Sequence, residues 1–297
     1  MSLCTDPSNL LMKQISTLVS DIYNLFTNEK GVQVSREEAK QLSEEAGRLI
    51  GEHIFSSVYE TRKNKPDLRL SQIGKPLRQI WYNSKGYDKE PIDGPTFIKF
   101  LYGNILEELL VCLSRLAGHT VDETQKEIKV GGIKGHQDGR VDGVLVDFKS
   151  ASNFSFKKFT TSELQKNDPF GYIYQLAGYA EQEKDEKVAW VVINKQTGEL
   201  ATVYLDSLEM PDVKAKIKQV KDAVKKDTPP DRCYSDIRDG SSGNRKLDFG
   251  CVYCGYKLTC WSDANNGKGL RKFNYSNGPR YFTQVYREPN TEEEVII

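Results

Sequence analysis

Two aspartates and a lysine are spaced so that a β-hairpin would gather their charges. The segment GHQDGRVDGVLVDFK spans residues 135–149. Its Asp-Gly pair at 142–143 is a strong turn signal, because both central positions of a type I′ turn need a positive φ. Counting outward from this turn places Asp138 directly opposite Asp147, on one face of the sheet. Since side chains alternate along a strand, Lys149 joins that face.

Carboxylates that face each other across a strand pair repel, so something must offset the repulsion. Mg²⁺ is a natural candidate, since it favours one or two carboxylates, keeps several waters and is completed by substrate phosphates. Lys149 beside such a metal could orient a water or stabilise charge that develops on a phosphate. The alternative is an ordinary hairpin with solvated charges on its outer face. These residues alone do not choose between the two.

The order Asp138, then Asp147-Phe148-Lys149 at the end of an apolar strand, resembles the core of the PD-(D/E)XK nucleases. The resemblance implies an α/β fold of the restriction-endonuclease type, with a mixed central sheet flanked by helices. It also implies that Asp138, Asp147 and the backbone carbonyl of Phe148 bind Mg²⁺ or Mn²⁺. Lys149 would then position the attacking water.

Two flanking motifs extend this resemblance. Upstream, Gly103 and Glu107 resemble the helical Gly-x-x-x-(Glu/His) motif, which makes Glu107 a further catalytic acid on the metal side. Glycine one turn earlier leaves the space in front of that carboxylate open. Downstream, Gln175 and Tyr179 resemble the Gln-x-x-x-Tyr motif of the RecB-like branch, and their i, i+4 spacing places them on one helix face. Asp168-Pro169 is expected to cap and begin that helix.

Four cysteines form the second group of chemical interest. Cys251, Cys254 and Cys260 follow a C-x2-C-x5-C spacing, and Cys233 precedes them. Four thiolates suit either a tetrahedral Zn²⁺ or a [4Fe–4S] cluster, and the spacing does not choose between them. Buried structural thiols are the alternative reading. Cys112 is expected to pack in the core.

The cysteine spacing, with Trp261 after it, resembles the iron–sulfur motif of AddB-type and CRISPR-associated RecB-like exonucleases and their phage homologues. This resemblance implies a [4Fe–4S] cluster, with zinc as the alternative. Those families take their first cysteine from an upstream Ser-x-x-Gly-x-Cys-x-Arg-x-x-Trp-Tyr segment. Residues 71–82 match the segment, but Pro76 stands at the cysteine position. Cys233 is therefore the candidate for the fourth ligand.

Around these motifs the sequence predicts three regions. Helical periodicity and a capping box that begins at Ser35 predict an N-terminal helical extension over residues 1–65. The nuclease core is expected over residues 66–232. Residues 233–297 are expected to form the cysteine region and a C-terminal hairpin, around 276–279, packed on the core. The predicted core strands are 125–131, 133–140, 144–150 and 188–193.

Composition limits where a nucleic acid could bind. The 42 basic residues balance 42 acidic ones, so a DNA-binding surface must be local. Candidates are Lys157, Lys158 and Lys166, together with His136, which is expected on the acidic face two residues before Asp138. A satisfied structural histidine is the alternative there. The chain shows no membrane-spanning run and no signal peptide, which predicts a cytoplasmic protein.

The motifs together predict a metal-dependent DNA exonuclease of the RecB-like kind, which would act on single-stranded DNA or duplex ends. A role in phage or bacterial recombination, repair or DNA degradation is expected, with recombination proteins as possible partners. Two alternatives are a structure-specific or restriction-like endonuclease and a non-catalytic nucleic-acid-binding protein on the same fold. Glycine-rich phosphate loops are absent from the sequence, so no attached helicase motor is expected.

Overall fold

The computed structural model describes residues 13–28, 31–59, 66–276 and 278–294. Two sequence predictions fall partly beyond these ranges. They are the N-terminal helical extension over residues 1–65 and the C-terminal hairpin around 276–279, of which residues 1–12, 29–30, 60–65 and 277 lie outside the described residues.

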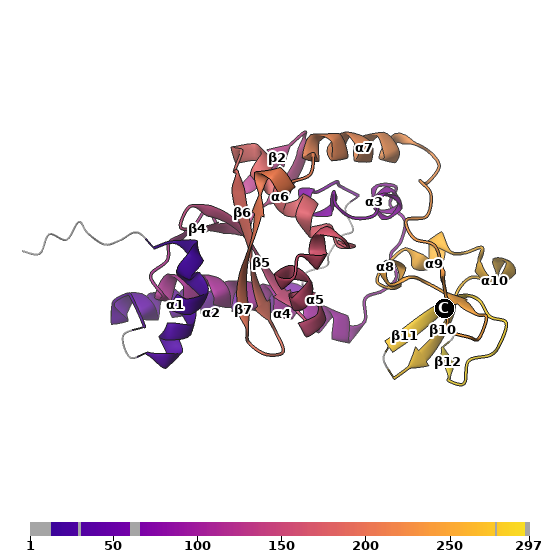
Figure 1. Ribbon diagram of the computed structural model, residues 1–297, viewed down its shortest axis with the longest axis horizontal. Coiled ribbons are helices and arrows are strands. Elements are labelled where there is room, and N and C mark those ends of the chain that lie inside the picture. The colour runs from indigo at the N-terminus through magenta and orange to yellow at the C-terminus, as the bar shows by residue number, and fades with distance from the viewer. Residues whose placement is uncertain (1–12, 29–30, 60–65, 277, 295–297) are drawn as a thin grey trace, which may run out of the picture.

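A five-stranded mixed sheet forms the centre of the fold (Figure 1), in the order β1-β4-β5-β6-β7. Strands β5 and β6 are parallel, and the other neighbours are antiparallel. The predicted mixed sheet flanked by helices is therefore confirmed. The strand bounds are β1 Val121–Asp122, β4 Gly139–Val141, β5 Val144–Ala151, β6 Lys187–Asn194 and β7 Leu200–Asp206.

The hairpin β4–β5 has the register that its turn predicts. Asp142 and Gly143 both have positive φ, 49° and 81°. Gly139 pairs with Val146, and one further step in this register brings Asp138 opposite Asp147. The Asp-Gly turn was enough to predict the register of this hairpin, because the turn alone sets the register of a short hairpin.

The predicted strand 133–140 is wrong in one respect, because the chain turns a corner at Gln137–Asp138. Residues before the corner form β3 (Ile133–His136), which pairs with β2 (Glu127–Val130) in a separate two-stranded sheet. The Gln137 side chain is buried at the corner, and its amide donates to the Glu123 carbonyl and carboxylate. The expected place of His136 on the acidic face was therefore also wrong. It lies opposite Glu127 and is exposed.

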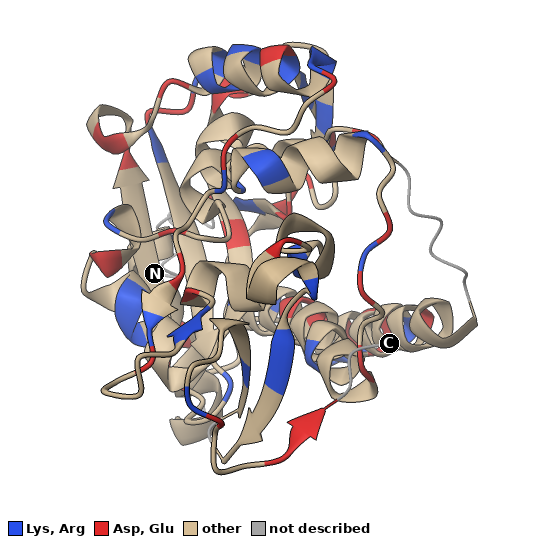
Figure 2. Cartoon of the chain, turned by 90° about the vertical axis from the view of Figure 1, so that its right-hand side faces the viewer, with Lys and Arg blue, Asp and Glu red and all other residues tan. Residues whose placement is uncertain are grey.

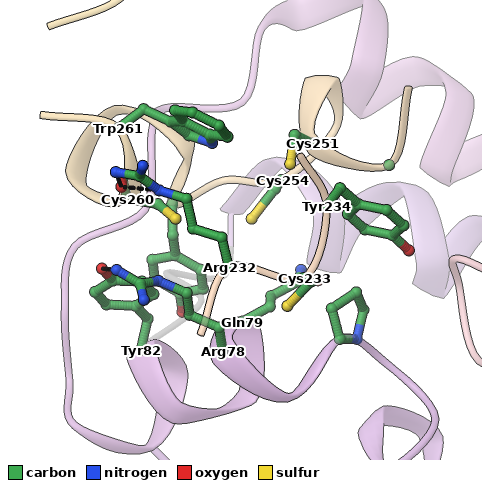
Figure 3. Close-up of a pocket in the computed structure, with 13 residues that line it drawn as sticks. Arg78, Gln79, Tyr82, Arg232, Cys233, Tyr234, Cys251, Cys254, Cys260 and Trp261 are labelled. Carbon is green, nitrogen blue, oxygen red and sulfur yellow. Dashed lines mark hydrogen bonds between the residues drawn. The ribbon is translucent and has the colours of Figure 1, made fainter. Parts of the chain in front are cut away.

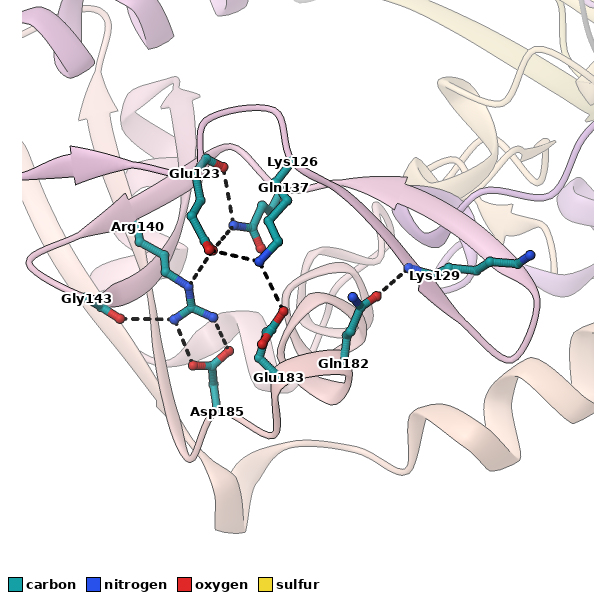
Figure 4. Close-up of polar contacts among 9 residues, drawn as sticks. All are labelled: Glu123, Lys126, Lys129, Gln137, Arg140, Gly143, Gln182, Glu183 and Asp185. Atoms are coloured by element: carbon teal, nitrogen blue, oxygen red, sulfur yellow. Dashed lines mark hydrogen bonds and ion pairs between the residues drawn. The ribbon is translucent and has the colours of Figure 1, made fainter.

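A network of ion pairs fixes the corner (Figure 4). The Arg140 guanidinium donates two parallel hydrogen bonds to Asp185, of 2.9 and 2.8 Å, and its Nε lies 3.0 Å from Glu123 Oε2. Lys126 bridges Glu123 to Glu183 at the end of a helix. Bidentate pairs of this kind fix direction as well as distance. The network therefore holds the chain that leads into Asp138.

Helices cover both faces of the sheet. On one face α1 (Leu18–Thr27) and α4 (Gly94–Leu116) pack with Val146 and Phe148 of β5. On the other face α5 (Asn153–Thr160) and α6 (Tyr172–Glu183) pack with Leu145 of the same strand. The side of β5 that carries Asp147 and Lys149 is thus covered by helices, not solvated as in an ordinary exposed hairpin.

The remaining elements surround this centre. Helix α2 (Arg36–Tyr59) packs on α4, and α3 (Leu77–Ser84) packs on α7 (Val213–Lys225). Short 3₁₀ helices occur at Ile15–Thr17, Leu70–Gln72, Glu163–Gln165 and Ser207–Glu209. Acidic and basic residues are interspersed over the side of the molecule that Figure 2 shows, and the two kinds are equal in number over the chain. Within the described ranges, no helix is long and apolar enough to cross a membrane.

The C-terminal residues form a second lobe beside α3 (Figure 1). Its helices are α8 (Phe249–Val252), α9 (Lys257–Cys260) and α10 (Ala264–Gly267). Its five-stranded sheet has the order β12-β10-β11-β9-β8. The strand bounds are β8 Ile237–Arg238, β9 Arg245–Lys246, β10 Arg271–Tyr275, β11 Gly278–Gln284 and β12 Glu293–Glu294.

Candidate functional site

Three carboxylates and one ammonium meet where β4, β5 and α4 come together. Lys149 Nζ lies 2.5 Å from Asp147 Oδ2, and Asp147 has no exposed surface. Asp138 Oδ2 accepts a hydrogen bond of 2.8 Å from the Phe148 N–H. Glu107, on α4, is near enough that the charges of Lys149 and Asp147 act on its carboxyl group. The structure thus brings together the four charged residues that the motifs single out.

The acidic cluster is electrostatically strained. Burial raises the pKa of Asp138, Asp147 and Glu107, and the charge of Asp147 raises the pKa of the other two further. The pKa of Glu107 reaches about 7. Burial also disfavours the charged form of Lys149, but Asp147 and Asp138 outweigh it and raise the pKa of the ammonium. One ammonium therefore faces three carboxylates, which leaves negative charge for a further cation to neutralise.

Gln175 and Tyr179 lie on the covered side of this cluster. Gln175 Nε2 donates to Asp147 Oδ1 at 3.0 Å and to the Tyr179 hydroxyl at 3.1 Å. Both side chains come from one face of α6, as their spacing predicts. The hydrogen bond from Gln175 to Asp147 is one that the helical spacing could not predict, since the two residues lie 28 positions apart.

Helix α6 begins later than predicted. Its first residue is Tyr172, preceded by Gly171 with φ 78°, and not Pro169. Asp168 still caps the helix, because its carboxylate accepts from the N–H groups of Gly171 and Ile173, both at 2.9 Å. Gly171 in turn touches Gly74, where an added Cβ would lie 2.6 Å from the Gly171 Cα. This close approach fixes residues 71–82 against the start of α6.

A cavity of about 760 Å³ reaches the cluster from outside. Glu107, Phe148 and Lys149 line it. Gly103 lines it too, and a Cβ there would have only Ser150 Oγ within 4 Å, at 3.8 Å. The expected open approach to the Glu107 carboxylate is therefore present.

The lysines that line this cavity are not the predicted ones. Lys75, Lys99 and Lys195 belong to its wall, whereas Lys157, Lys158 and Lys166 do not. The Lys158 ammonium lies 5.0 Å from the centre of the Phe154 ring. For Lys195 a signal existed, because it directly follows β6, and parallel strands end at the same edge of a sheet. Lys75 and Lys99 come from segments whose position depends on the fold.

The donor atoms at the cluster suit Mg²⁺ or Mn²⁺ held by few protein ligands. Asp147 Oδ2 is buried, and its contact is the ion pair with the Lys149 ammonium. That ammonium also lies 3.5 Å from the Phe148 carbonyl oxygen. Across the described part of the chain, no group of three or more His, Cys, Asp or Glu side chains forms a preformed metal-binding site. Mg²⁺ needs none, since one or two carboxylates, waters and phosphate oxygens complete its shell.

Four cysteines line a second cavity, between α3 and the C-terminal lobe (Figure 3). They are Cys233, Cys251, Cys254 and Cys260. Pro76 lines the same cavity, so the position where the resembling families carry a cysteine does lie at this place. Cys112 is buried and free, as predicted for a core residue.

The surroundings of the thiols are apolar on one side and cationic on the other. Burial raises the pKa of Cys251 to about 12 and also raises that of Cys254, and the neighbouring thiols add to both shifts. Arg232 donates to the Cys260 carbonyl at 2.8 and 3.2 Å, and its guanidinium lies 4.0 Å from the Trp261 ring centre. Half-buried thiols with raised pKa values form thiolates when a bound metal neutralises them.

Comparison with other proteins gives distant structural likenesses. The sequence matches no protein-family profile and no curated protein. The solved protein SSO0001 is 17% identical with a TM-score of 0.40, over 72% of this chain and 95% of its own. An alkaline exonuclease from Laribacter hongkongensis is 13% identical with a TM-score of 0.38, over 54% of this chain and 90% of its own.

A phage-related exonuclease from Haemophilus somnus is 19% identical with a TM-score of 0.37, over 54% of this chain and 90% of its own. Two of these three neighbours are named as exonucleases. Likeness of this degree assigns no activity, so the function has to be argued from the site itself.

Proposed function

We propose that this protein is a metal-dependent deoxyribonuclease that hydrolyses phosphodiester bonds from DNA ends. The observation that carries the proposal is the buried cluster of three carboxylates around a single ammonium, Lys149, beside an open cavity. Buried negative charge that one ammonium leaves uncompensated is strongly destabilising unless a further cation neutralises it. A divalent cation with a phosphate group is the ligand that this charge pattern fits.

Each residue of the site would have a role that follows from its position. Asp147, Asp138 and the Phe148 carbonyl, with Glu107 on the cavity side, would hold Mg²⁺ or Mn²⁺. The bound cation would supply Lewis-acid polarisation of a phosphate oxygen. Lys149, on its flexible four-carbon stem, would donate to the attacking water or to a phosphate oxygen. Gln175 holds Asp147 in place through one amide hydrogen bond and Tyr179 through another.

The direct test is degradation of end-labelled single- and double-stranded DNA with Mg²⁺ or Mn²⁺. Asp147→Asn and Lys149→Ala should each lower the rate by at least about a hundredfold, because the first removes a metal ligand and the second removes the cation beside the reacting phosphate. The exposed acid Glu209 provides the control, and Glu209→Gln should leave the rate unchanged. Unchanged activity in both site variants would contradict the proposal.

Two alternatives are separated by the choice of substrate. Covalently closed circular DNA should stay intact with an exonuclease, whereas a structure-specific or restriction-like endonuclease would open it. Metal-independent DNA binding without any cleavage would support a binding protein on this fold. A cytoplasmic role with recombination proteins as partners remains a prediction from the sequence.

For the four cysteines we propose a [4Fe–4S] cluster that joins the C-terminal lobe to the core. The four thiols share one cavity, and four thiolates suit either a [4Fe–4S] cluster or a tetrahedral Zn²⁺. The choice of the iron–sulfur cluster rests on the resemblance of the C-x2-C-x5-C spacing, with Trp261 after it, to the iron–sulfur motif. Cys233, beside Pro76, would supply the fourth thiolate.

Purified protein should accordingly be brown, with visible absorption and bound iron. Cys251→Ser or Cys233→Ser should lower the iron content and the free energy of unfolding, because binding energy at a structural site is folding energy. The matched control is Cys112→Ser, at a thiol outside the cavity. A colourless protein with one bound zinc would overturn the choice of cluster.

A further inference from the structure

Two aromatic rings of the C-terminal lobe reach into the cavity of the acidic cluster. Phe249 and Tyr253 both line that cavity, and they stand on either side of Cys251 in the sequence. Phe249 is 49% exposed and Tyr253 68% exposed, so neither ring is buried in a core. Their ring centres lie 5.1 Å apart in an edge-to-face arrangement. Apolar rings exposed inside a cavity point to a ligand with a flat apolar face.

The same cavity carries the charges that such a ligand would need. Lys99 and Lys75 belong to its wall, as do Glu107 and Lys149 of the acidic cluster. The phosphates of a ligand would therefore lie near these lysines, and the group attached to the phosphates would lie against the two aromatic rings. A nucleotide chain combines both features, because every base has a face that stacks on an aromatic side chain and every link is an anion.

The ring pair is also held firmly. Helix α8, which carries Phe249, starts at Asp248, whose carboxylate accepts from the Gly250 N–H at 2.9 Å. An added Cβ on Gly250 would lie 2.5 Å from the Tyr234 ring, so the backbone of α8 packs directly on that ring. Rings on a fixed backbone lose little conformational entropy when they bind.

We propose that Phe249 and Tyr253 form a nucleobase-stacking subsite, through which the cysteine-bearing lobe positions an unpaired nucleotide chain toward Glu107 and Lys149. This inference deepens the proposed nuclease function and rests on it for the identity of the ligand. It assigns the C-terminal lobe a direct part in substrate binding. The two rings are positioning residues, because they contact the base and not the scissile phosphate.

The test is a binding measurement that needs no cleavage. Fluorescence anisotropy without added divalent metal compares a labelled oligothymidylate with an abasic oligonucleotide of the same length, which has the same phosphates and no bases. The intact protein should bind oligothymidylate more tightly. Phe249→Ala with Tyr253→Ala should weaken that binding by at least about fivefold, because stacking on each base is lost. Affinity for the abasic strand should stay the same.

Two controls keep the result specific. Tyr253→Phe retains the ring and should bind as the intact protein does. Tyr286→Ala removes a ring of the same lobe that is 73% exposed and does not line the cavity, and it should also have no effect. Iron or zinc content and the melting temperature report whether the double variant is folded and loaded.

Equal affinity of the intact protein for oligothymidylate and the abasic strand would contradict the proposed stacking subsite. An equal loss of affinity for both strands, in a double variant that is folded and metal-loaded, would contradict it as well. Failure of the nuclease proposal has a different signature, since base-dependent binding would persist while no DNA is degraded with Mg²⁺ or Mn²⁺. Cleavage without base-dependent binding would instead reject the subsite alone.

Discussion

Glu107 is the acid of the cluster that stands at the cavity wall, and its carboxylate accepts a hydrogen bond of 3.0 Å from Gln125. Burial, together with the charge of Asp147, raises its pKa from the ordinary 4.5 to about 7. Between these two values the folded protein binds more protons than the unfolded chain. The stability contributed at this position therefore falls as the pH rises from 4.5 to 7 and is constant above 7.

Glu107→Gln should remove this dependence while keeping a side chain that can bond to Gln125. Without divalent metal above pH 7, the variant should be more stable than the intact protein by about 1 to 3 kcal/mol. Near pH 4 the two should be alike. Urea unfolding across the pH range measures the difference, and DNA degradation by the variant should be strongly reduced.

Glu209→Gln serves as control for the pH series, because Glu209 is exposed and far from the cluster in sequence. A Glu107→Gln protein that is less stable than the intact one above pH 7 would show that the carboxylate is well compensated in the fold. The account of the cluster as electrostatically strained would then fail. Added Mg²⁺ should stabilise the intact protein more above pH 7 than near pH 4.

At the scale of elements, α6 is placed by a contact between two glycines. Gly74 and Gly171 touch through their backbones, and Asp168 caps the helix from the same turn. This contact sets where α6 begins and therefore where Gln175 meets Asp147. Part of it was predictable, since a glycine with φ 78° is expected at a tight turn. The contact with Gly74 was not predictable, because Gly74 and Gly171 lie 97 positions apart in the sequence.

Gly74→Ala should disturb this junction. The new Cβ would lie 2.6 Å from the Gly171 Cα and carbonyl oxygen, so backbone must move. We expect a loss of about 1 to 3 kcal/mol in the free energy of unfolding, as for overpacking in a core. Catalytic rate should fall as well, because the shift displaces Gln175 from Asp147. Urea unfolding and DNA degradation measure the two effects.

The matched control is Gly51→Ala on α2, where no atom lies within 4 Å of an added Cβ. Alanine in a helix interior should stabilise the protein by about 0.5 to 1 kcal/mol. Similar effects of both substitutions would contradict the role given to the glycine contact.

At the scale of the whole molecule, a chain with no net charge must concentrate its cations where an anionic ligand binds. The lysines of the cavity wall, Lys75, Lys99 and Lys195, come from three separate segments. The fold gathers them around one opening.

Lys99→Ala with Lys195→Ala should lower affinity for single-stranded DNA and reduce its salt dependence. A plot of log affinity against log salt concentration has a negative slope, and each phosphate contact that is lost should make this slope shallower by about 0.7. Lys157→Ala with Lys158→Ala is the matched control, since these lysines lie on α5 outside the cavity. Anisotropy titrations at several salt concentrations compare the pairs. A larger change in slope for the control pair would favour the surface that the sequence predicted.

The sequence by itself determined the features that depend on near neighbours. The Asp-Gly turn sets the register that brings Asp138 opposite Asp147, and the i, i+4 spacing sets Gln175 and Tyr179 on one helix face. Turn geometry and helical periodicity act over a few residues, so no other part of the chain needs to be known. The mixed sheet was an expectation implied by the resemblance of these motifs to the PD-(D/E)XK nuclease core.

Only the tertiary structure decided which distant residues share the site. The corner at Gln137 moved His136 away from the acids, and packing of the C-terminal lobe brought Phe249 and Tyr253 to the cavity. The corner depends on a contact between residues 14 positions apart, and the cavity brings together segments about a hundred positions apart. The spacing of residues within one segment gives no information about such a partner segment. The burial of the Asp147 side chain also depends on the tertiary structure, because α6 covers a strand face that an isolated hairpin would leave in water.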